Sequence, residues 1–173
     1  MRKLVLMAVV AALLLCTVAL AAGCGADTAQ AQQYMKKGDD LMSQVEQLAN
    51  QFQTKVQQGL GDITNPSTIQ QIKDMANAID TKAQEARAAY ARIGTLKGVG
   101  DYVQYADLQT RMIADLSKSV GAMNAFLDKA TAAMSPADLQ AASEAYQKDL
   151  QDLNQEMTDL EQQASKLKDD KNL

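Results

Sequence analysis

The chain has 173 residues, of which 22% are charged and 4% are aromatic, and it contains no His, no Trp and only two Cys. Without His there is no imidazole base, no Ser-His-Asp or Cys-His pair and no His-ligated metal. The net charge is −4, and residues 24–173 hold 15 basic and 21 acidic side chains, because Arg2 and Lys3 are the only charges before them. An acidic chain is poorly suited to phosphate backbones, so we expect no nucleic-acid partner.

The N-terminus has the pattern of a secretion signal. The basic residues Arg2 and Lys3 precede a run, residues 4–22, that is apolar apart from Thr17. A short basic segment followed by an apolar run and small residues is typical of a signal peptide. We therefore predict that residues 1–23 are removed and take no part in the fold.

The apolar run ends at a cysteine, since residues 20–24 read Leu-Ala-Ala-Gly-Cys. Small residues directly before a Cys resemble the lipobox, or type II signal peptide, of bacterial lipoproteins. The resemblance covers about the first 24 residues. It implies that Cys24 carries S-diacylglycerol and an N-linked acyl chain such as palmitate, which anchor the chain in the lipid bilayer. With Cys16 removed and Cys24 acylated, the folded part has no thiol for disulfide or redox chemistry.

Two other outcomes remain open for this segment. Residues 19–21, Ala-Leu-Ala, also fit the cleavage site of an ordinary secretory signal, which would release a soluble protein. The apolar run is alternatively long enough to stay as one membrane-spanning helix. All three outcomes place residues 25–173 outside the cytoplasm. We predict a lipid-anchored protein on the extracytoplasmic face of the cell membrane, and Gly25 after the Cys permits transfer to an outer membrane in an organism that has one.

The remainder of the chain shows helical rather than strand periodicity, because apolar residues recur at steps of three and four over long distances. In the second segment the stripe consists of Ile69, Ile72, Ala76, Ile79, Ala83, Ala86, Tyr90 and Ile93. In the fourth segment it consists of Leu139, Ser143, Tyr146, Leu150, Leu153, Met157, Leu160, Ala164 and Leu167. This heptad spacing is typical of helices that pack at a shallow angle.

Glycine and proline punctuate the periodic segments. Asn65-Pro66 and Ser135-Pro136 each combine an N-cap residue with Pro at the first helical position, and three glycines fall within residues 94–100. We predict helices over 29–58, 66–94, 101–133 and 136–168. The predicted fold is all-α. Because the connections are short, we expect an up-down-up-down antiparallel four-helix bundle over residues 29–170. Residues 24–28, which begin with Cys24, form the tether to this bundle. A helical hairpin that associates with further copies is the alternative.

No residue pattern indicates an enzyme, a metal site or a cofactor. A di-iron bundle needs inward Glu and Glu-x-x-His motifs, whereas acids such as Glu85, Asp115 and Glu156 fall off the apolar stripes. The adjacent pair Asp39-Asp40 points in directions about 100° apart on a helix and is not expected to share a ligand. We therefore predict no catalytic residues and no cofactor.

The tyrosines form the most informative group. In the predicted topology Tyr34, Tyr90, Tyr102 and Tyr105 all fall at one end of the bundle, the end nearest to Cys24. Tyrosine has an apolar ring and a polar hydroxyl, so the group suits a half-hydrated helix end. Two interpretations follow, namely packing of the bundle mouth and a small-ligand pocket or docking patch.

The predicted function is a non-enzymatic binding or scaffolding role in the bacterial cell envelope, with an envelope protein as partner. The alternative is a small-ligand sensor or carrier that acts with a separate membrane partner. Outer domains of chemoreceptors are bundles of similar size, which is an analogy of fold alone.

Overall fold

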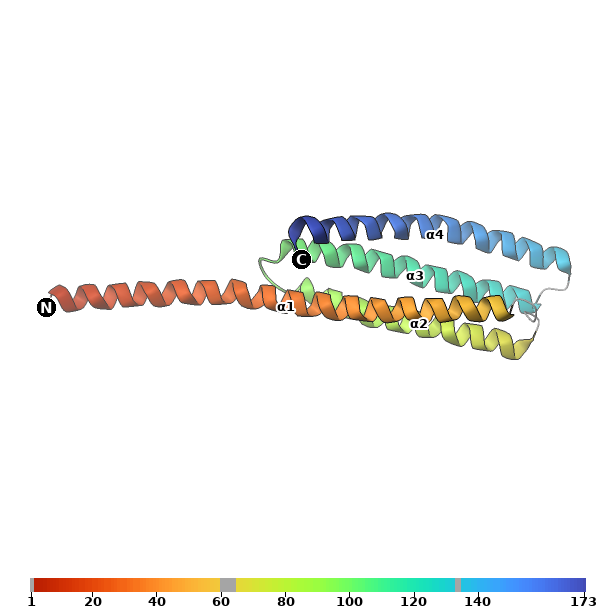
Figure 1. Ribbon diagram of the computed structural model, residues 1–173, viewed down its shortest axis with the longest axis horizontal. Helices are drawn as coiled ribbons and strands as arrows, with labels where there is room; N and C mark the ends of the chain where they lie inside the picture. The colour runs from red at the N-terminus through yellow and green to blue at the C-terminus, as the bar shows by residue number, and fades with distance from the viewer. Residues whose placement is uncertain (1, 60–64, 133–134) are drawn as a thin grey trace.

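A computed structural model describes the backbone of residues 2–59, 65–132 and 135–173, and their side chains from residue 25 onward except at 57–59 and 136. Over these ranges the fold is all-α. The helices are α1 (Arg2–Gly59), α2 (Pro66–Ile93), α3 (Gly100–Ala132) and α4 (Pro136–Lys171), with no strand among the described residues. They assemble as a helical bundle, past which α1 extends toward the N-terminus (Figure 1).

The helix boundaries agree with the predicted ones to within a few residues, except for the first. Residues 24–28, which the sequence predicts to be a tether, lie within α1. The predicted connections are residues 59–65 and 134–135, and most of them fall outside the described residues, at 60–64 and 134. Among the residues whose structure is described, no helix is long and apolar enough to cross a membrane.

Local interactions define where α2 and α4 begin. The Asn65 side chain accepts a hydrogen bond from the Ser67 backbone N–H at 2.9 Å. The Ser135 hydroxyl accepts from the Asp138 N–H at 3.2 Å and donates to the Asp138 carboxylate at 2.7 Å. Such caps satisfy N–H groups that have no partner within the helix. Proline at the next position in each helix follows the predicted pattern.

The apolar stripes of the helices are buried to different extents. All eight residues of the predicted α2 stripe are buried. Of the nine predicted in α4, only Leu160 and Ala164 are buried, and the others are half-buried. The difference follows from the helix contacts, because α2 packs on both α1 and α3, whereas α4 packs on α3 and scarcely touches α1.

Candidate functional site

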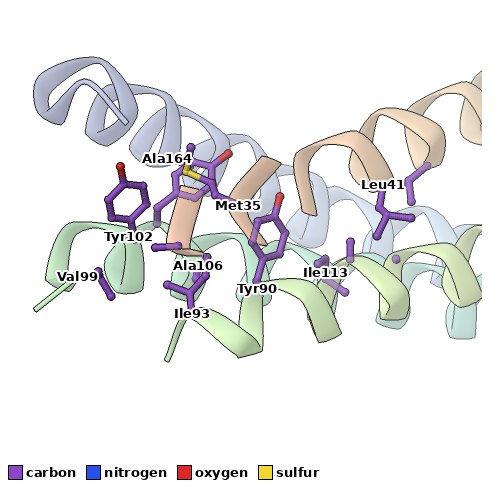
Figure 2. Packing of buried hydrophobic residues seen from close by; sticks show 14 of the residues in the cluster. Met35, Leu41, Tyr90, Ile93, Val99, Tyr102, Ala106, Ile113 and Ala164 are labelled. Carbon is purple, nitrogen blue, oxygen red and sulfur yellow. The ribbon is translucent and has the colours of Figure 1, made fainter. Parts of the chain in front are cut away.

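The structure brings the four predicted tyrosines into one apolar cluster. Tyr90, Tyr102 and Tyr105 are buried in it, and Tyr34 packs against it half-buried. Figure 2 shows the Tyr90 ring rising from α2 toward α1, near Met35, with Tyr102 further along the same core. We call this group the tyrosine cluster.

The centre of the tyrosine cluster is the carboxylate of Asp39 on α1. Its Oδ1 accepts hydrogen bonds from the hydroxyls of Tyr90 and Tyr105, both at 2.8 Å. Its Oδ2 accepts from the Lys168 ammonium at 2.7 Å. The four side chains come from α1, α2, α3 and α4, so one carboxylate connects all four helices.

Ring contacts tighten this arrangement. The Tyr90 and Tyr105 rings meet edge to face, with centroids 6.1 Å apart and planes at 71°. The Lys168 Nζ lies 5.6 Å from the centroid of the Tyr105 ring, within cation–π range. On α1, Gly38 has no side chain to hold Tyr90 away, since a Cβ there would lie 2.4 Å from the ring.

Burial, followed by the nearby charge of Asp39, raises the pKa of Tyr90 above its ordinary value. The same two causes, in the same order, raise the pKa of Tyr105. Both hydroxyls therefore keep their protons at neutral pH and act as hydrogen-bond donors to Asp39 rather than as bases. This chemistry suits a structural connection between helices.

Sequence reasoning missed Asp39, Lys168 and Gly38. Nothing in the local sequence distinguishes Asp39 from Asp40, which pairs instead with Lys36 on the exposed face of α1. The one available signal was Gly38, because a glycine inside an apolar-periodic helix costs stability unless something packs closely against it.

Asp115, one of the acids that fall off the apolar stripes, is nevertheless buried. Its exposed fraction is only 2%. The Asp115 Oδ1 pairs with the Lys118 ammonium at 2.6 Å, and among the described residues its Oδ2 has no hydrogen-bond partner. A position outside the apolar stripe of its own helix therefore does not by itself make a side chain exposed in the bundle.

A cavity of about 140 Å³ lies deeper in the bundle, where α1 and α4 stand apart. All four helices contribute to its walls. The lining side chains include Ala49, Phe52, Ser119, Met123, Tyr146 and Leu150. An apolar cavity of about 150 Å³ is large enough to hold a benzene ring. We call it the mid-bundle cavity.

Tyr146, the one tyrosine outside the tyrosine cluster, lines the mid-bundle cavity. Its ring stacks on Phe126 of α3, with centroids 5.2 Å apart and planes at 18°. Burial raises the pKa of Tyr146 to about 12. Among the described residues, its hydroxyl has no protein hydrogen-bond partner.

The described residues contain no group of three or more His, Cys, Asp or Glu side chains that could hold a metal ion. The Cys24 side chain lies outside the described ones, so its lipidation stays a prediction from sequence. Comparison with known protein families, with curated proteins and with solved structures finds no match to this chain.

Proposed function

We propose that the chain is an extracytoplasmic bacterial lipoprotein, anchored by acyl chains on Cys24, with a non-enzymatic binding role in the cell envelope. The anchor rests on the apolar run and the small residues before Cys24. The observation that carries the binding role is the mid-bundle cavity, which the four helices leave between α1 and α4. A concave, mainly apolar pocket that several helices line is the usual form of a small-molecule site in a bundle.

The finer architecture that we propose is the up-down-up-down antiparallel bundle with heptad packing. The Asp39 contacts support it, since they join the first part of the bundle-forming stretch of α1 to the end of α2, the start of α3 and the end of α4. Those four positions meet at one end only if successive helices reverse direction.

The anchor would hold the tyrosine cluster toward the membrane. Asp27 lies three residues after Cys24, and its carboxylate accepts a hydrogen bond at 3.2 Å from the backbone N–H of Lys97, in the connection between α2 and α3. This contact supports a close approach of that connection to the anchor point. The mid-bundle cavity would then lie further from the membrane surface, open to molecules of the envelope.

The anchor is tested by mass spectrometry of the chain from its own membrane, with Cys24→Ala and Cys16→Ala as a matched pair. We expect the wild-type and the Cys16→Ala chains to begin at Cys24 and to carry diacylglycerol. The Cys24→Ala chain should lose the lipid and the membrane attachment that depends on it. An unlipidated chain that begins near Ala22 would indicate ordinary secretion, and an intact N-terminus would indicate a spanning helix.

The second candidate function is a small-ligand sensor or carrier that works with a separate membrane partner. The concave, half-open shape of the mid-bundle cavity favours it over a flat protein interface. Native mass spectrometry of the same sample separates the two functions. A bound small molecule supports the sensor or carrier, whereas a co-purifying envelope protein supports the scaffold.

A further inference from the structure

We propose that the mid-bundle cavity binds a small, uncharged, mainly apolar molecule, with the Tyr146 hydroxyl as its hydrogen-bonding group. This inference rests on the proposed binding role and is independent of the Cys24 anchor. Its basis is the juxtaposition of an apolar space of about 140 Å³ with one half-buried phenol, Tyr146, whose hydroxyl has no hydrogen-bond partner among the described residues.

The walls of the mid-bundle cavity determine the polarity of the ligand. Phe52, Met123 and Leu150 supply apolar surface from α1, α3 and α4. Among the side chains that the structure describes, no Asp, Glu, Lys or Arg lines the space. A charged ligand would have to lose its hydration without gaining an opposite charge, which is costly. An uncharged apolar body enters without that cost and gains contacts that the empty space lacks.

The two hydroxyls at the mid-bundle cavity are not equivalent. Ser119 donates its hydroxyl to the backbone carbonyl of Asp115 at 3.0 Å, so its proton is already committed within α3. The Tyr146 hydroxyl has no such bond, and its raised pKa of about 12 keeps it protonated at neutral pH. It is therefore available to donate a hydrogen bond to an oxygen or nitrogen of the ligand.

The seam between α1 and α4 provides the entrance. The two helices are joined at the tyrosine cluster by the Asp39–Lys168 ion pair. Beyond that point they scarcely touch, and the cavity residues Ala49, Phe52 and Leu150 are only half-buried. A small molecule can thus reach the mid-bundle cavity without unfolding a helix.

The full-length lipidated chain in lipid nanodiscs, labelled with ¹³C at its methionine methyl groups, provides the test. Three probes of similar ring size are toluene, p-cresol and benzoate. We expect toluene and p-cresol to shift the Met123 methyl resonance in a saturable way, and benzoate to leave it unchanged. Met35, buried in the tyrosine cluster, serves as the reference resonance and should not shift.

Variants separate specific binding from partitioning into lipid. Ala49→Leu fills the mid-bundle cavity and should abolish the saturable shift, whereas Ala145→Leu, on the exposed face of α4, should leave it intact. Tyr146→Phe should weaken p-cresol binding by about three- to tenfold, the effect of one hydrogen bond, with toluene unaffected. Circular dichroism confirms that each variant keeps its helices.

Several outcomes would overturn the proposal. One is the absence of a saturable Met123 shift with either neutral probe, and another is equal binding of benzoate. If Tyr146→Phe left the affinity for p-cresol unchanged, the Tyr146 hydroxyl would not be the group that hydrogen-bonds the ligand. Failure here, together with capture of an envelope protein by the same lipidated chain, would leave the proposed binding role standing and exclude only this ligand class.

Discussion

At the scale of single residues, the Asp39 carboxylate is the shared hydrogen-bond acceptor that joins two tyrosines of the tyrosine cluster to Lys168. Its own exposure is 26%, and it accepts hydrogen bonds from two buried phenols and one ammonium. Hydrogen bonds to a charged group are stronger than neutral ones, and leaving their buried donors without an acceptor is costly. The neighbouring Asp40 has no comparable role, because its partner Lys36 is exposed.

Replacement of each acid by Ala makes a matched pair. We expect Asp39→Ala to lower the free energy of unfolding by about 2–4 kcal/mol, because it leaves the Tyr90 and Tyr105 hydroxyls and the Lys168 ammonium without their acceptor. Asp40→Ala should leave the unfolding midpoint nearly unchanged, since exposed pairs contribute little. Urea unfolding followed by circular dichroism measures both. Equal effects of the two substitutions would show that the Asp39 contacts do not stabilise the fold.

Two helical glycines form a second matched pair. A Cβ on Gly38 would lie 2.4 Å from the Tyr90 ring, whereas a Cβ on Gly121 would meet nothing within 4 Å. Gly38→Ala should therefore destabilise the chain by about 1–3 kcal/mol through overpacking. Gly121→Ala should stabilise it by about 0.5–1 kcal/mol through helix propensity. Thermal unfolding should show a lower midpoint for Gly38→Ala and a higher midpoint for Gly121→Ala. If both substitutions raised the midpoint, the Tyr90 ring would be able to shift without cost to accommodate the new methyl group.

At the scale of helices, the four elements differ in how much of their apolar stripe is covered. The α2 helix packs between α1 and α3, and its stripe is buried from Ile69 to Ile93. The first two thirds of α4 has contacts mainly with α3, and its stripe is half-buried there. Because helix stability in proteins comes mostly from tertiary packing, the two helices should open with different free energies.

Hydrogen exchange tests this difference directly. In the full-length chain, we expect backbone amides of residues 139–157 to exchange faster than those of residues 69–90. Amides near Leu160 and Ala164, which are buried, should be slower than those earlier in α4. Exchange followed by mass spectrometry of peptic peptides gives the profile. Uniform protection along α2 and α4 would indicate that the seam between α1 and α4 closes in solution.

At the scale of the whole molecule, the buried Tyr90 and Tyr105 and the half-buried Tyr146 link stability to alkaline pH. Burial raises the pKa of Tyr90, Tyr105 and Tyr146, the last to about 12. In the unfolded chain each phenol returns to a pKa of about 10. Above that pH the unfolded state loses protons that the folded state retains. The stabilising effect is thus fully present below about pH 10 and is lost as the pH rises from there toward the folded-state values.

We therefore expect the free energy of unfolding to stay level up to about pH 10 and to fall above it. Each retained proton contributes a slope of up to about 1.4 kcal/mol per pH unit, and solvent screening reduces the share of the more accessible Tyr146. Urea unfolding at pH 8, 9, 10 and 11 measures the slope. In a Tyr90→Phe chain the free energy of unfolding should fall less steeply with pH. Equal slopes for the wild-type and Tyr90→Phe chains would show that Tyr90 does not contribute to the pH dependence.

The amino-acid sequence was enough to predict the all-α class, the first residues of α2 and α4, and the buried stripe of α2. These features depend on local causes: the period of the apolar residues, the capping side chains of Asn65 and Ser135, and proline at the first helical position. The gathering of the four tyrosines was also predictable, because their places along the helices follow from element lengths and short connections. Cys24 and its lipid remain predictions from the sequence.

Two features depend instead on how the helices pack together: which polar residues enter the interior, and where the core opens to solvent. Asp39 and Asp40 are identical in type and adjacent in sequence, yet only Asp39 faces Tyr90, Tyr105 and Lys168. Asp115 is buried although it lies off the apolar stripe of α3, and the mid-bundle cavity lies where α1 and α4 stand apart. These outcomes depend on the relative rotation and separation of whole helices, which the periodicity of one helix does not specify.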